Sequence, residues 1–181
     1  AENKQVSFKY FEYTVNKERK FRKNGEKYTT SPYALSWDDE NYYLITFSEK
    51  YNDFTHYRVD KMTDIEIIDQ VRAKLPEGEH FNVAEYSKKV FNMFGGEEET
   101  VKIQFDNSLV NVVIDRYGKD ITIEKVDENS FSVRIKVAVS STFFAWVFQF
   151  GDKVKILSPE SVVDKYSENL DKIISLYRLY R

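Results

Sequence analysis

The chain of 181 residues contains no cysteine and only two histidines, His56 and His80. The lack of cysteine excludes disulfides, thiolate nucleophiles and cysteine metal sites, so we expect a cytoplasmic protein rather than a small secreted scaffold. The two histidines stand 24 positions apart, without an HExxH motif or a closely spaced partner. The sequence therefore predicts no zinc site and no cofactor.

Long apolar runs and a strong net charge are missing too. No apolar run approaches the roughly 18 residues of a membrane span, and the N-terminus has no signal-peptide pattern, so we expect no membrane association and no export. The formal net charge is only −3. The chain as a whole therefore lacks the positive charge typical of nucleic-acid binding, so only a local basic patch could indicate that it binds nucleic acid.

Catalytic motifs are also missing. Neither G-x-S-x-G nor S-x-x-K occurs between a predicted strand and a predicted helix. The acidic pair Asp38-Asp39 lies in a predicted hairpin turn, where such side chains are usually solvated. We expect that the protein is not an enzyme. A nuclease would need acidic residues at metal-binding spacing, and none is evident.

Aromatic residues, in contrast, are plentiful, with 13 tyrosines and 14 phenylalanines, a composition that argues against disorder. The first third of the chain alternates short apolar segments with turns. These segments suit a small antiparallel barrel of the SH3-like or Sm-like type over residues 1–66. The predicted strands of this barrel include residues 6–13, 31–37, 41–47 and 54–62.

The rest of the chain predicts a mixed α+β domain. Residues 67–99 indicate a linker with one helix, which we expect over about residues 82–94. Residues 100–181 follow the order β-α-β-β-α-β of a ferredoxin-like fold, with one further helix at the C-terminus. Asp106 is the predicted cap of the first of these helices, and Ser140 or the next serine caps the second.

A basic hairpin is predicted next to the turn signal Asn24-Gly25, with Phe21 and Tyr28 nearby. Positive charge interleaved with aromatic rings suits a polyanion that offers phosphates and bases, although it equally suits a solubilising hairpin tip. The five basic residues are Lys17, Arg19, Lys20, Arg22 and Lys23.

Two strand positions raise a question of orientation. In 41–47, adjacent Tyr42 and Tyr43 must point to opposite faces of the sheet, and in 31–37 we expect Tyr33 to share a face with Leu35 and Trp37. Arg58 lies inside the strand 54–62, where its guanidinium suits phosphate contact or base stacking. An ion pair with the nearby Asp60 is the alternative interpretation.

Taken in order, the segments SPYALSW, YYLITF and HYRVDKM resemble the WYL domain, an SH3-like barrel, over residues 1–66. Tyr42 stands where the family has its name-giving Trp. The second half resembles the WCX extension that follows this domain in bacterial regulators. The segments that carry this second resemblance are VKIQF, VIDRYG, FSVRIKVAV and FAWVFQFGDKVKILSP.

The resemblance implies the sensor part of a transcriptional regulator, whose ligand is single-stranded nucleic acid or a nucleotide. Duplex DNA would be read by an N-terminal winged helix-turn-helix, which we expect to be missing from this sequence because nothing before Val6 can form one. Tyr42 is expected to share a face with Leu44, as a residue of the core or of the barrel seam. The residues expected to bind the ligand are Tyr33, Tyr43, His56 and Arg58.

A homodimer is expected as well. The alternative hypothesis is a structural module that mediates dimerisation or binds protein without a small ligand. The observation that supports this alternative is the predicted helix FFAWVFQF, residues 143–150, which has more aromatic residues than one helix face normally buries.

Overall fold

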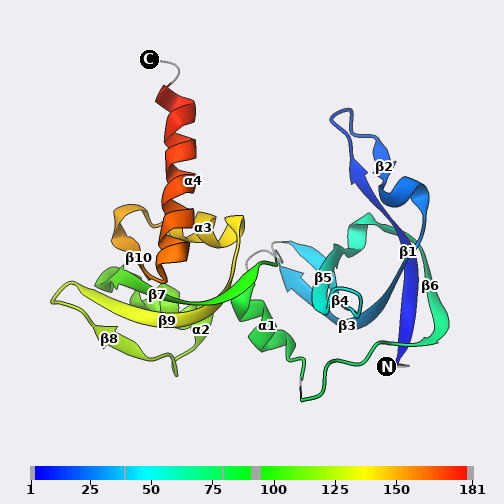
Figure 1. Ribbon diagram of the computed structural model, residues 1–181, viewed down its shortest axis with the longest axis horizontal. Coiled ribbons are helices and arrows are strands. Elements are labelled where there is room, and N and C mark those ends of the chain that lie inside the picture. Colours follow the sequence, from blue (N-terminus) through cyan, green and yellow to red (C-terminus); the bar gives the residue numbers. More distant parts are fainter. Residues whose placement is uncertain (1–2, 39, 79, 91–94, 179–181) are drawn as a thin grey trace. The chain divides into compact units, whose positions relative to one another are not determined.

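The computed structural model describes residues 3–38, 40–78, 80–90 and 95–178. The chain divides into two compact units, the N-terminal unit Ala1–Ser87 and the C-terminal unit Lys88–Arg181 (Figure 1). Among the described residues, none of the helices has the length and apolar character needed to cross a membrane. Each unit is described by itself below.

The N-terminal unit is a six-stranded antiparallel sheet that curls into a half-barrel, in agreement with the predicted SH3-like or Sm-like class. Its strand order is β2-β1-β3-β4-β5, and β6 pairs with β1. The strands are β1 (Lys4–Tyr13), β2 (Arg19–Phe21), β3 (Tyr28–Asp38), β4 (Asn41–Ser48), β5 (Asp53–Arg58) and β6 (Met62–Val71).

Aromatic rings fill the concave side of this half-barrel. Phe8 and Tyr10 of β1 are buried together with Met62. The Phe8 ring centroid lies 5.0 Å from that of Tyr57 and 5.7 Å from that of Tyr28. Burial raises the pKa of Tyr57 to about 12. Phe8 is stacked on Tyr28 and packs edge to face with Tyr57, and such large rings supply much of the apolar area of this small core.

Strand β6 was not predicted, because its sequence lacks the alternation of a half-buried strand. Ile65 and Ile67 are exposed, and neighbouring acidic side chains form ion pairs with lysines of β1. The turn between β1 and β2 spans Thr14 to Glu18, whereas Asn24-Gly25 connects β2 to β3. The basic hairpin therefore exists, with its tip earlier in the chain than the turn signal.

The C-terminal unit has the predicted ferredoxin-like βαββαβ order followed by one helix. Its antiparallel sheet has the strand order β10-β7-β9-β8. Buried side chains of α2, α3 and α4 join those of the sheet in one core. The elements are β7 (Glu97–Asp106), α2 (Val110–Tyr117), β8 (Ile123–Lys125), β9 (Ser130–Val139), α3 (Ser141–Phe148), β10 (Val154–Ser158) and α4 (Glu160–Arg178).

Local capping signals define the helices of this unit. Asp106 accepts a hydrogen bond from the Ser108 amide (2.9 Å) at the 3-10 turn that leads into α2. Of the two predicted serine caps for α3, Ser140 is the one used, since its hydroxyl accepts a hydrogen bond from the Phe143 amide at 3.2 Å. Such caps satisfy amides that a helix leaves unpaired.

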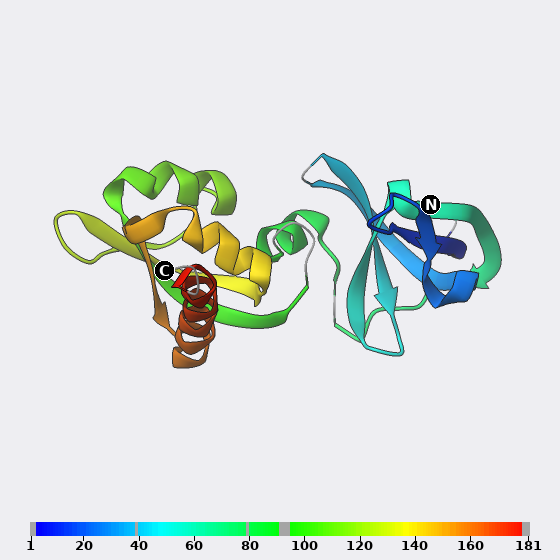
Figure 2. The same ribbon diagram turned by 90° about the horizontal axis from the view of Figure 1, so that it is seen from above.

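Two helices bear on function. Helix α1 (Val83–Lys89) is shorter than predicted, and the predicted extension over 91–94 lies outside the described residues. Helix α4 is anchored by buried Val162, but residues 171–178 are all exposed. Figure 1 shows this second half standing away from the sheet of its unit, and Figure 2 looks nearly along the axis of α4. In α3, Trp146 packs against Phe105 and Phe150.

Candidate functional site

A bulge in β3 decides where Tyr33 points. The register of β3 with β4 shifts by one residue at Tyr33. Such a bulge re-aims the side chain, and the Tyr33 ring lies near Phe47 and Phe54, at centroid distances of 6.2 and 5.8 Å. The expectation that Tyr33 shares a face with Leu35 and Trp37 is therefore wrong, because strict alternation holds only in a regular strand.

The register of β4 with β5 brings the other candidates together. Tyr43 lies directly opposite Arg58, and the next pair on the same side is Ile45 opposite His56. With Tyr33 added by the bulge, all four residues expected to bind ligand lie on one side of the β3-β4-β5 sheet. We call this side the candidate face. Whether it binds a ligand stays a prediction.

Tyr42 points to the other side and is 57% exposed, so its predicted place in the core is wrong. Its ring packs edge-on against Trp37 at 4.7 Å, at the end of the β3-β4 hairpin beyond the aromatic core. The candidate face also carries buried apolar residues, which form a second core on this side of the sheet. Ile45 and Phe47, the apolar neighbours of Tyr43 on this face, are fully or almost fully buried.

Arg58 forms a bidentate ion pair with Asp60. Its Nε donates to one carboxylate oxygen at 3.1 Å, and a terminal nitrogen donates to the other at 2.8 Å. The pair raises the pKa of Arg58 and lowers that of Asp60. The ion pair expected as an alternative is thus present. A guanidinium has five N–H donors, so the pair leaves donors for an anion as well.

The chain that follows β6 folds back over the candidate face, which the sequence reasoning missed. The Tyr86 hydroxyl of α1 lies 2.9 Å from Nε2 of His56. Phe81 packs on Phe54 and on Tyr86, with centroid distances of 4.6 and 5.3 Å. These rings cover the middle of the face, between Tyr33 at one end and the pair of Tyr43 with Arg58 at the other.

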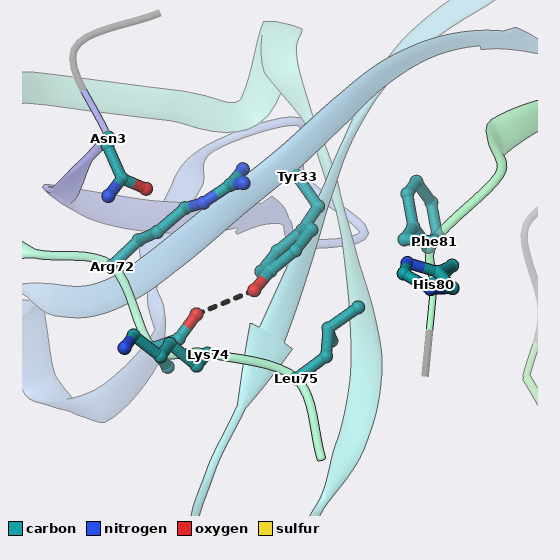
Figure 3. A pocket seen from close by; sticks show the side chains of 8 residues that line it. Asn3, Tyr33, Arg72, Lys74, Leu75, His80 and Phe81 are labelled. Carbon is teal, nitrogen blue, oxygen red and sulfur yellow. Dashed lines mark hydrogen bonds between the residues drawn. The ribbon is translucent and has the colours of Figure 1, made fainter. Parts of the chain in front are cut away.

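At the Tyr33 end, the same segment forms a pocket of about 480 Å³, shown in Figure 3. The Tyr33 hydroxyl donates to the Ala73 carbonyl at 2.6 Å, and the Arg72 guanidinium lies 4.1 Å from the centre of the Tyr33 ring. The other residues that line the pocket are Asn3, Lys74, Leu75, His80 and Phe81. His80 is exposed, as expected for a solvated residue.

Among the residues that the structure describes, no group of three His, Cys, Asp or Glu side chains is arranged to hold a metal ion.

Comparison with protein-family models gives two matches. The model of the WYL domain matches residues 1–67, and the model of the WCX domain matches residues 97–174. The chain is a WYL-domain protein with a WCX domain.

Two solved structures resemble this WYL–WCX chain. A CRISPR Cas-related protein is 14% identical, with 98% of this chain and 49% of that chain covered and a TM-score of 0.51. Proteasome accessory factor B/C (PafBC) of Arthrobacter aurescens is 16% identical, with 97% and 25% covered and a TM-score of 0.39. The chain thus spans between a quarter and half of these proteins. Comparison with curated proteins gives no match.

The two domains indicate a regulatory role rather than an enzymatic one. The WYL match contains all four residues of the candidate face, whereas Arg72, Lys74 and Phe81 lie beyond its last matched residue. The alternation of basic and apolar residues after β6 is a sequence signal for Arg72 and Lys74, but it does not extend to Phe81. The pocket is therefore built by the WYL domain together with the segment that follows it.

The basic hairpin of the WYL domain uses much of its charge internally. Arg22 forms an ion pair with Glu12, while Lys17 and Lys20 are exposed. Arg22 and the two remaining cations also lie over rings of their own unit, so those ring faces are already covered. These contacts are Arg19 over Phe11 (4.5 Å), Arg22 over Tyr10 (5.5 Å) and Lys23 over Tyr28 (4.0 Å).

Proposed function

We propose that the WYL domain is the effector-sensing part of a cytoplasmic transcriptional regulator and that it binds single-stranded nucleic acid or a nucleotide on the candidate face. The observation that carries this proposal is the pairing of Tyr43 with Arg58 across β4 and β5. A ring next to a guanidinium offers one surface for a base and one for a phosphate.

The surroundings of this pair keep Arg58 both accessible and fixed in position. The Arg58 side chain is 32% exposed, so it can reach a ligand without unfolding the sheet. Its backbone amide is fixed by a hydrogen bond to the Tyr10 hydroxyl at 3.1 Å. The strand and this hydrogen bond fix the backbone from which the guanidinium projects, which lowers the entropic cost of binding.

The experiment is a titration of labelled single-stranded DNA, followed by fluorescence anisotropy at low and moderate salt. We expect Arg58→Ala to weaken binding about tenfold or more, as for a lost charge-assisted hydrogen bond, and to reduce the dependence on salt. Lys119→Ala, an exposed lysine of the other unit, is the control for charge. Binding that is absent, or indifferent to Arg58→Ala, would contradict the proposal.

The two tyrosines give a second comparison on the same assay. Tyr43→Ala should weaken binding of the oligonucleotide more than Tyr42→Ala, because only Tyr43 lies on the face of Arg58. The opposite order would show that the ligand uses the exposed side that carries Tyr42 and Trp37.

A second candidate function, homodimerisation, is favoured by the C-terminal unit. A groove of about 300 Å³ between α3 and α4 is lined mainly by apolar side chains, including Phe144, Phe148 and Leu170. Apolar residues of α4 recur at spacings of three and four, the pattern of a helix that packs against another helix. They are Val163, Tyr166, Leu170, Ile173 and Tyr177.

We propose that a second copy of the chain packs on this groove. Phe148 and Leu176 are 54% and 61% exposed, so their replacement by glutamate should leave the core of the unit intact. Sedimentation equilibrium should show a concentration-dependent dimer for the wild type and a monomer for the variant with both changes. A wild type that stays monomeric at high concentration would exclude this dimer.

A further inference from the structure

We infer that the pocket beside Tyr33 is a separate site for a small ligand that carries a phosphate at one end and a planar ring at the other, such as a nucleoside monophosphate. The pocket measures about 480 Å³, within the range of roughly 300–1,000 Å³ typical of small-molecule sites. The inference extends the proposed function to a second ligand, which binds at the opposite end of the candidate face from Arg58.

One end of the pocket is cationic. In Figure 3 the side chains of Arg72 and Lys74 lie on one side of Tyr33. No acidic residue lines the pocket among the residues that the structure describes, and no ion pair of Lys74 is found there. A pocket with two positive side chains and no carboxylate among its described lining residues attracts an anion, and a phosphate can accept hydrogen bonds from a guanidinium and from an ammonium.

Two contacts within the protein fix the position of the Arg72 side chain before any ligand binds. One of its terminal nitrogens donates to the Pro32 carbonyl at 3.2 Å, and its guanidinium plane lies over the Tyr33 ring. These contacts fix the direction of the side chain and use only part of its five N–H donors. A phosphate would therefore meet a cation that is already positioned, with little further loss of side-chain entropy.

The other end of the pocket is apolar and aromatic. Figure 3 shows Phe81 and His80 across the pocket from Leu75 and Tyr33. The Phe81 ring is fixed from behind by Phe54, at a centroid distance of 4.6 Å. A planar ring placed between Leu75 and Phe81 would gain apolar burial and aromatic contact. A ligand with phosphate and base in this order fits both ends.

Such a ligand would also tie down the segment that leads from the WYL domain towards α1. The start of this segment is already fixed, because the Ala73 amide donates to the Ser31 hydroxyl at 2.8 Å. Lys74 and His80, in contrast, are exposed. A ligand that contacts both would link the fixed start of the segment to its far end. Occupancy of the pocket would then be transmitted as stiffening of residues 74–78.

The test is isothermal titration of the full chain with the four common nucleoside monophosphates, with adenosine and with ribose 5-phosphate. We expect at least one monophosphate to bind about tenfold or more tightly than the compound that lacks its phosphate or its base. Lys74→Ala should weaken that binding about tenfold or more without lowering the melting temperature of the free protein. Protection of residues 74–78 from hydrogen exchange should rise with ligand.

Matched variants separate this site from the one at Arg58. Lys50→Ala removes an exposed lysine of the same unit that does not line the pocket, and should have no effect. Arg58 does not line this pocket, so Arg58→Ala should leave the binding step that Lys74→Ala removes, while any binding at the candidate face is lost, and the two proposals can fail independently. If none of the four monophosphates binds, or if Lys74→Ala binds as tightly as the wild type, the inference is overturned.

Discussion

The ion pair between Arg58 and Asp60 allows the role of Arg58 to be tested without removing it. Asp60→Asn keeps the size of the side chain but removes its charge. The side chains of the pair are 32% and 55% exposed, so solvent screens it and its loss should cost about 0.2–1 kcal/mol of unfolding free energy. For a unit of this size, 1 kcal/mol corresponds to a fall in Tm of roughly 4–8 °C.

The effect on ligand binding should have the opposite sign. A phosphate bound to Arg58 would lie on the order of 5 Å from the Asp60 carboxylate, and repulsion at that distance in a watery environment amounts to about 0.5–1 kcal/mol. Asp60→Asn should therefore tighten binding of single-stranded DNA roughly two- to five-fold. The variant is thus expected to be slightly less stable and to bind more tightly, a combination that general damage to the fold does not produce.

The same pair predicts a dependence on pH. Hydrogen bonds from Arg58 hold the pKa of Asp60 below its ordinary value of 3.8. The folded state therefore gains stability from this carboxylate above about pH 4 and loses it as the pH falls through the lowered pKa. The difference in Tm between the wild type and Asp60→Asn should be complete at pH 7 and should shrink below pH 4.

The assays are thermal unfolding and anisotropy titration at the same ionic strength. Asp64→Asn is the matched control, because Asp64 pairs with Lys9 of β1, away from the candidate face. This control should leave affinity unchanged. If Asp60→Asn binds no more tightly than the control, Arg58 serves only as a structural partner of Asp60, and the proposed role of the candidate face is refuted.

Three further predictions concern stability. Ser140→Ala removes the cap of α3 and should cost about 1 kcal/mol, measured by urea unfolding of the C-terminal unit. Tyr86→Phe removes the hydroxyl that reaches His56 and should lower the free energy of unfolding of the N-terminal unit by about 0.5–1.5 kcal/mol. An unchanged free energy of unfolding would show that this hydrogen bond does not stabilise the unit. Burial raises the pKa of Glu98, but hydrogen bonds from two lysines outweigh it and leave the pKa below 4.5. Glu98→Gln should therefore lower Tm at pH 7 and have little effect near pH 3.

The C-terminal unit was predictable because its signals are local. Strict alternation defines β9, Ser140 and Asp106 mark helix starts, and Gly118 ends α2 with a φ of +91° that other residues rarely adopt. Each signal acts within a few residues of the element it defines. The order of the elements then limits the sheet to few topologies.

The candidate site was predictable only in part. Alternation and the family pattern placed Tyr43, His56 and Arg58 on one side, and the register agrees. The bulge at Tyr33 and the covering of His56 by Tyr86 depend on contacts between residues far apart in sequence. No local pattern encodes such pairing, which is why the pocket beside Tyr33 was not expected.

The two tryptophans of the chain have a practical consequence, because each unit contains one. Trp37 is 60% exposed at the end of the β3-β4 hairpin, whereas Trp146 is packed among the rings of the C-terminal core. A tryptophan in water emits at longer wavelength than one among apolar groups. Trp37→Phe would leave a fluorophore that reports the C-terminal unit alone, and Trp146→Phe one that reports the hairpin. The chain thus carries its own pair of optical probes, with which the order of unfolding of the two units can be read without attached dyes.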